Sequence, residues 1–166
     1  DTILPLVKKY GAAVVGLTLD KDGIPKTAEG RFRLAEKILD IPSDIPIGAD
    51  VRYSCPGFIL LGKILEKTFG MQLDQCFHEL VAKPLGFENT LFLPLNRENT
   101  VNSNLDKTKR GIVNDYNCQF LGGIAGNAGL FSNLSDVTKY VLFLQNRGKP
   151  LIKEETFLLA AQNHTA

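Results

Sequence analysis

The sequence has few of the residues that bind metals or form disulfide bonds, since its 166 residues include only three cysteines and two histidines. Cys55, Cys76 and Cys118 are odd in number and widely spaced, which fits neither a CxxC metal pair nor a disulfide framework. His78 and His164 are isolated, with no carboxylate or cysteine at a ligand-like helical spacing. The pattern therefore predicts packed ordinary thiols, surface or packing histidines, no metal site and no cofactor.

The sequence also lacks an excess of either charge and any long apolar run. Its 19 lysines and arginines against 18 aspartates and glutamates form no basic stripe, which predicts no nucleic-acid partner. The longest apolar stretches, such as Ala12–Leu17 and Phe58–Leu61, fall short of the roughly 20 residues that a membrane span needs. Asp1 opens the sequence with neither a basic segment nor a signal-type apolar stretch, so the compartment stays open. A hydrophobic content of 44% with 22% charged residues is typical of a packed globular domain.

The first segment, residues 1–41, has the order helix, strand, loop, helix. A short helix is predicted over residues 2–10, the apolar run Ala12–Leu17 fits a parallel strand covered on both faces, and a second helix is predicted from Thr27. The stretch Leu4–Glu29 resembles the pterin-binding barrel of corrinoid-dependent methionine synthases and methyltetrahydrofolate methyltransferases. The resemblance implies one unit of a TIM-barrel type, of which a closed barrel needs eight, and it assigns no folate-contacting residue.

Residues 42–166 form the second predicted domain, after a connection at residues 41–48 that contains two prolines and a glycine. Its pattern is mostly helical with one short strand, so the predicted fold class of the chain is mixed α+β. The expected elements are a helix from Pro56 to Gly70, a helix from Leu73 that Pro84-Leu85-Gly86 stops, a polar surface excursion from Leu95 to Val113, a strand at Gly129–Ser132, a helix from Ser135 or Asp136 to Gly148, and an amphipathic stretch at Glu154–Gln162.

Four blocks of this second segment occur together in one known family. They are Tyr53–Cys55 with Gly57–Glu66, Lys83–Thr90, Asn114–Asn117 with Leu121–Gly123, and Gly126–Ser132. With these blocks, residues 42–166 resemble the β-lactamase-related serine hydrolases, the group of class C β-lactamases, penicillin-binding carboxypeptidases and related esterases. The resemblance implies an incomplete domain of that fold, mostly its helical part, and hydrolysis of amide or ester substrates through an acyl-enzyme.

The same resemblance assigns roles to five residues. Tyr53 takes the place of the general base, and a phenol with an ordinary pKa of about 10 needs neighbouring cations to act so at neutral pH. Cys55 stands where the family has asparagine or aspartate, whose directed hydrogen bonds a thiol cannot replace. Asn127 stands where relatives usually have histidine, beside the acyl site, and Ala128 and Gly129 would offer backbone N–H groups to an oxyanion hole. Glycine-rich strand packing is the structural alternative for this last segment.

The nucleophile motif of that family, a serine followed three residues later by lysine, is absent from the sequence. The residues three places after Ser43, Ser54, Ser103, Ser132 and Ser135 are Pro46, Gly57, Asp106, Ser135 and Thr138. We therefore expect a fragment of a serine hydrolase that is inactive as this chain and whose complete form acts on a small-molecule or peptide-like substrate. Two alternatives stay open, a partial corrinoid-dependent methyltetrahydrofolate methyltransferase and a non-catalytic penicillin- or peptide-binding module. No pattern indicates an oligomeric state.

Overall fold

The computed structural model describes residues 37–40, 46, 49, 51, 53–101 and 110–163. The described part is mostly helical, with one small two-stranded sheet. The helices and strand expected before residue 37, most of the connection at residues 41–48, and His164 lie outside the described residues, and no TIM-barrel unit is seen in the part that the structure describes.

Helix α3 (Cys55–Phe69) begins and ends where the sequence predicts a helix. Its start is capped by Ser54, whose Oγ accepts the backbone N–H of Gly57 at 3.0 Å, and Pro56 occupies the first turn, where a missing N–H costs no hydrogen bond. Gly70 ends the helix in the left-handed conformation, with a φ of 65° that glycine adopts without steric cost. Local signals alone therefore fix the limits of α3.

A continuous helical segment follows α3 and ends within the predicted stop Pro84-Leu85-Gly86. It comprises α4 (Leu73–Phe77), the π-helical turn η2 (His78–Ala82) and α5 (Lys83–Leu85). In a regular α-helix the proline ring would clash with the carbonyl group four residues earlier, and the wider π turn just before the proline accommodates the ring. The segment ends at Gly86, with a φ of 66°, which lies within the predicted stop, whereas the π turn inside the segment was not predicted.

Two short strands and one short helix lie beside α3. Strand β1 (Leu91–Phe92) pairs antiparallel with β2 (Leu130–Phe131). Strand β2 falls within the predicted strand, whereas β1 was not predicted. Helix α6 (Tyr116–Phe120) was not predicted either, although Asp115 caps it by accepting the backbone N–H of Cys118 at 2.8 Å. Elements this short contain too few residues for a period to show.

The last two helices agree with the predicted pattern. Helix α7 (Leu134–Gln145) starts slightly earlier than expected because Asn133 caps it, accepting the backbone N–H of Asp136 at 2.9 Å. Helix α8 (Glu154–Ala160) lies within the amphipathic stretch at the end of the sequence. Two 3-10 turns complete the described elements, η1 (Lys37–Asp40) and η3 (Arg97–Asn99).

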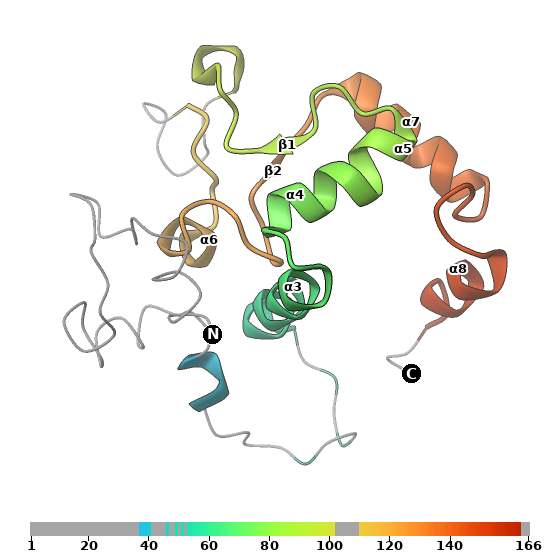
Figure 1. Ribbon diagram of the computed structural model, residues 1–166, viewed down its shortest axis with the longest axis horizontal. Helices are drawn as coiled ribbons and strands as arrows, with labels where there is room; N and C mark the ends of the chain where they lie inside the picture. Colours follow the sequence, from blue (N-terminus) through green and yellow to red (C-terminus); the bar gives the residue numbers. More distant parts are fainter. Residues whose placement is uncertain are drawn as a thin grey trace.

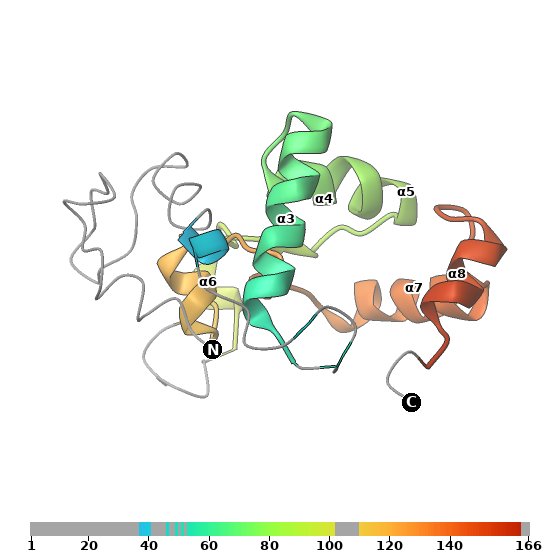
Figure 2. The ribbon, with the colours of Figure 1, turned by 90° about the horizontal axis from the view of Figure 1, so that it is seen from below.

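Helix α3 lies between α6 on one side and the α4–α5 segment on the other (Figures 1 and 2). It contacts α4, α4 contacts β1, and α5 contacts α7. The largest fully buried side chains are Ile59, Leu121, Cys118 and Asp136. In contrast, Phe58, Leu61 and Ile64 of α3 are each more than half exposed, so much of the predicted apolar face of this helix stays uncovered. None of the described helices combines the length and apolar character that crossing a membrane requires.

Candidate functional site

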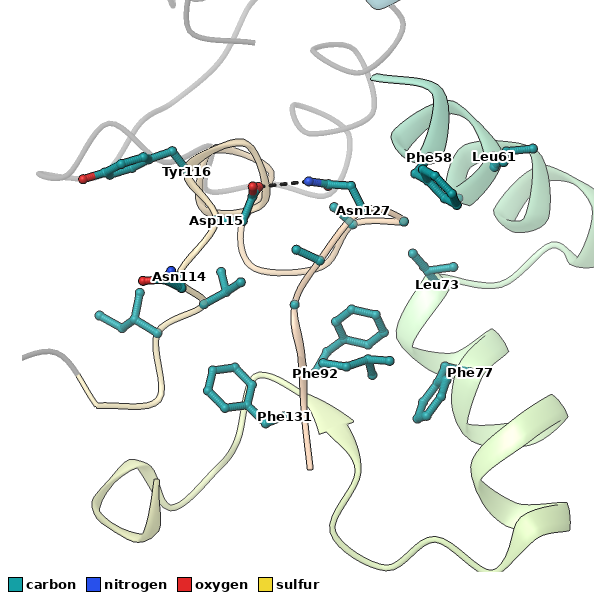
Figure 3. A pocket seen from close by; sticks show the side chains of 18 of the residues that line it. Phe58, Leu61, Leu73, Phe77, Phe92, Asn114, Asp115, Tyr116, Asn127 and Phe131 are labelled. Carbon is teal, nitrogen blue, oxygen red and sulfur yellow. Dashed lines mark hydrogen bonds between the residues drawn. The ribbon is translucent and has the colours of Figure 1, made fainter. Parts of the chain in front are cut away.

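An open hollow of about 1210 Å³ lies between α3, α4, the two strands and the segment at residues 125–129, here named the wall loop. Its lining is mainly apolar, and Figure 3 shows the rings of Phe58, Phe77, Phe92 and Phe131 around it. Its polar side chains gather on the side formed by the wall loop and the start of α6. The hollow is therefore an apolar cavity with one polar side, as is usual for sites that bind small molecules.

Two glycines allow the wall loop to pack closely against its neighbours. A β-carbon added to Gly126 would collide with the carbonyl oxygen of Phe58 in α3. Gly129 has a φ of 117°, and a β-carbon there would lie 2.5 Å from the carbonyl oxygen of Gly123. Close packing therefore explains both glycines without any appeal to catalysis.

Asn127 ties the wall loop to the start of α6. Its Nδ2 group donates a hydrogen bond to Oδ1 of Asp115 at 2.9 Å, the dashed line in Figure 3. Because the acceptor is a carboxylate, this hydrogen bond is of the stronger, charge-assisted kind. Asn127, Ala128 and Gly129 all line the hollow, so the structure brings together three of the five site residues that the sequence proposed.

The other two proposed residues lie next to each other but do not line the hollow. Tyr53 is 85% exposed, and the thiol of Cys55 approaches its phenol oxygen at 3.7 Å. Cys55 is the main reason why the pKa of Tyr53 is raised above its ordinary value, and the negative charge of Asp115 adds to the effect. A raised pKa keeps the phenol protonated, which is the opposite of what a general base needs.

The three cysteines are free and buried, as predicted. Cys118 is fully buried, and its thiol donates to the carbonyl oxygen of Ala128 at 3.2 Å. Burial, with a smaller effect of the Asp115 carboxylate, raises the pKa of Cys118 to about 12. Among the described residues no group of three or more histidine, cysteine, aspartate or glutamate side chains gathers as a metal site would require.

Cys118 is expected to resist alkylation. At about pH 8 a thiol with a pKa of about 12 is ionised about a thousandfold less than an ordinary thiol with a pKa of about 8.5. Timed treatment with iodoacetamide, followed by peptide mass spectrometry, should show Cys118 unmodified in the folded chain and rapidly modified in denaturing urea. Labelling of Cys118 at the same rate in both conditions would contradict the structure.

Sequence reasoning missed Asp115 and the aromatic lining as parts of the site. Asp115 belongs to the block Asn114–Asn117, one of the four blocks on which the family resemblance rests. An aspartate is also a favoured residue just before a helix. The sequence could therefore have predicted Asp115 as a helix cap near the site. Phe92 and Phe131 come from two paired strands that are distant in sequence, and only tertiary structure places them on one hollow.

Comparison with known proteins places these features in a family. The Beta-lactamase family profile matches residues 14–165. A putative D-alanyl-D-alanine carboxypeptidase of Escherichia coli (strain K12) is 30% identical over 73% of this chain and 32% of its own length. An N-acetylmuramyl-L-alanine amidase of Bacillus subtilis (strain 168) is 28% identical over the same shares. The chain thus spans about a third of the length of these relatives.

Because the profile covers most of the chain, the chain belongs to the Beta-lactamase family. The match begins inside the segment 1–41 that the sequence linked to a pterin-binding barrel, and none of these similarities supports such a barrel. The boundary near residue 41 falls on residues that the structure does not describe, and it stays a prediction.

Proposed function

We propose that this chain supplies one side of an acyl-transfer site of the serine hydrolase type, and that the substrate is peptide-like. The observation that carries the proposal is the hollow, whose apolar lining meets a polar side made by the wall loop and Asp115. The relatives are named as an amidase and a carboxypeptidase, so an amide bond is the group we propose for cleavage in the complete protein.

In this proposal the backbone N–H of Gly129 faces the carbonyl group that reacts, because the N–H of Ala128, the other predicted donor, already bonds to the carbonyl oxygen of Ala125. An oxyanion hole needs main-chain donors held rigidly in place, and the wall loop is held by close glycine packing and by the Asn127–Asp115 hydrogen bond. The replacement of histidine by asparagine at position 127 leaves this main-chain donor unchanged. The proposed oxyanion side needs a side chain at position 127 that can donate to Asp115, and both asparagine and histidine can.

Tyr53 is the proposed general base only in a site that holds additional cations. Its raised pKa and its exposure to solvent leave a neutral phenol, and acyl transfer also needs an activated nucleophile within reach of the base. The 166 residues contain no serine with a lysine three positions later. We propose that these residues bind a substrate without cleaving it and that the nucleophile comes from outside them.

The chain is expected to form no covalent adduct with a β-lactam. Incubation with a fluorescent penicillin, followed by intact-mass spectrometry, should leave the mass of the chain unchanged, because no motif serine is present to be acylated. A penicillin-binding carboxypeptidase treated in parallel provides the positive control. A stable adduct on the unaltered chain would contradict this expectation, and peptide mass spectrometry would identify the residue that is acylated.

The non-catalytic binding module is the second candidate function, and the raised pKa of Tyr53 favours it. Both candidates predict that the chain binds benzylpenicillin or an acyl-D-Ala-D-Ala peptide reversibly, which equilibrium dialysis measures. Cleavage of the peptide once additional polypeptide supplies the nucleophile supports the hydrolase part, whereas binding without cleavage in either form supports the binding module. Binding of neither ligand in any form would contradict both proposals.

A further inference from the structure

The start of α6 contacts the wall loop at two points. The carboxylate of Asp115 accepts Nδ2–H of Asn127 at 2.9 Å, and the thiol of Cys118 donates to the carbonyl oxygen of Ala128 at 3.2 Å. Asp115 also accepts the backbone N–H of Cys118 at 2.8 Å. One carboxylate therefore fixes the first turn of α6 and the side chain of the wall loop at the same time.

The orientation of the Asn127 amide is set by Asp115. An ionised carboxylate can only accept hydrogen bonds, so it must face the NH2 group of the amide. The other atom of that amide, Oδ1 of Asn127, is shielded from solvent and accepts no hydrogen bond from any described residue. A buried acceptor without a hydrogen bond costs free energy. The hydrogen bond to Asp115 must therefore stabilise this orientation of the Asn127 side chain by more than that cost.

We propose that Asp115 is a positioning residue for the wall loop, holding the side chain at position 127 and thereby directing the backbone N–H of Gly129 toward the hollow. This inference rests on the proposed function, in which that N–H group faces the reacting carbonyl. Asp115 has a second link to the candidate site, because its charge is among the causes that raise the pKa of Tyr53, after the larger effect of Cys55.

The variant Asp115→Ser separates positioning from helix capping. Serine caps helices about as well as aspartate, but its hydroxyl is one bond shorter and does not reach both Cys118 and Asn127. Hydrogen exchange should then rise about tenfold at the N–H of Ala128, which bonds to Ala125, as expected for local opening of the wall loop. Exchange at the N–H of Gly123, which follows α6 and bonds to the carbonyl oxygen of Cys118, should not change.

The variant Asn127→His introduces an imidazole whose pKa can be measured. A purely structural role of Asp115 would not change that pKa. An imidazole can donate to the same carboxylate, which should raise its pKa above the ordinary value of about 6.5. Its proton NMR signal can be identified because the unaltered chain has only two histidines, His78 and His164. In the double variant Asn127→His/Asp115→Ser the midpoint should return to about 6.5.

These experiments distinguish failure of the inference from failure of the proposed function. If Asp115→Ser changes neither the exchange at Ala128 nor the imidazole midpoint, Asp115 positions nothing and the inference is overturned. Benzylpenicillin titrated into the unaltered chain tests the proposed function separately, through the amide signals of Ala128 and Gly129. A second outcome is that benzylpenicillin leaves these amide signals unchanged while Asp115→Ser alters both the hydrogen exchange at Ala128 and the pKa midpoint of the introduced imidazole. In that case Asp115 positions the wall loop, and the proposal that the wall loop faces the substrate is wrong.

Discussion

Replacing Asp136 by alanine is expected to lower the free energy of unfolding by about 3–5 kcal/mol, the usual cost of removing one partner from a buried charged network. Its carboxylate is completely buried near the start of α7, and Lys139 lies 3.2 Å away. It accepts the backbone N–H groups of Glu88 at 3.1 Å and Asn89 at 2.7 Å and the hydroxyl of Thr90 at 2.9 Å. Alanine would leave these donors without an acceptor. The urea midpoint of unfolding measures the loss.

The pH dependence of stability gives a second test of Asp136. Burial alone would raise the pKa of this carboxyl, but the hydrogen bonds from Asn89, Glu88, Thr90 and Lys139 lower it to about 2, from an ordinary value of 3.8. A lowered pKa contributes stability that is fully present above pH 3.8 and is lost as the pH falls toward 2, and here it amounts to about 2 kcal/mol. The stability difference between the unaltered chain and Asp136→Asn should therefore shrink over this range.

The matched control is Glu155→Gln in the first turn of α8. Glu155 is also an acidic residue near a helix start, but its side chain is 76% exposed and pairs with Lys153 at 3.6 Å. Such an exposed pair contributes little, so its loss should change stability by less than about 0.5 kcal/mol. If Asp136→Ala behaves like this control, the buried network does not hold residues 88–90 to α7.

The helices that the sequence predicted correctly carry their own start and stop signals. Ser54, Pro56 and Gly70 fix α3 within one stretch of chain, and each acts through a hydrogen bond or a backbone angle that neighbouring residues determine. The end of the α4–α5 segment falls within the predicted stop Pro84-Leu85-Gly86, but the π turn that accommodates Pro84 was not predicted. Local signals thus predict a helix reliably but not an irregular turn inside it.

The features that sequence patterns missed depend on contacts between distant residues. Strand β1 has two residues and exists because Leu91 and Phe92 meet β2 about 40 positions later. Asp136 was read only as a possible start of α7, since nothing near it in the sequence shows that the backbone of residues 88 and 89 needs an acceptor. Tertiary contacts of this kind leave no periodic signal.

The candidate site was partly predictable, because a motif identifies residues but not their surroundings. Asn127, Ala128 and Gly129 do line the hollow, whereas Tyr53 lies exposed beside Cys55 and away from it. The motif also could not show that the side-chain amide of Asn127 donates a hydrogen bond to Asp115. The role of a side chain depends on the group that it contacts. For Asn127 that group is the carboxylate of Asp115, to which the family resemblance assigned no role.

Gly126→Ala is expected to lower the free energy of unfolding by about 3 kcal/mol, at the upper end of the cost of overpacking. The new β-carbon would collide with the carbonyl oxygen of Phe58, which belongs to the backbone of α3 and cannot rotate away. Either α3 or the wall loop must move, so the hollow should change shape as well. Urea unfolding measures the first effect, and the amide signals of the wall loop measure the second.

Two alanine variants in α3 show whether the close approach of backbones is the cause. At Gly57 a β-carbon meets only the side chain of Ser54, at 3.2 Å, so Gly57→Ala should change stability by about 1 kcal/mol or less. A β-carbon added at Gly62 would lie 3.1 Å from the backbone nitrogen of Gly126. Gly62 therefore belongs to the same close contact between α3 and the wall loop, on the side of α3. One outward shift of the wall loop relieves both clashes, so Gly62→Ala and Gly126→Ala together should cost less than the sum of the two. Strict additivity would mean that α3 and the wall loop do not share this contact.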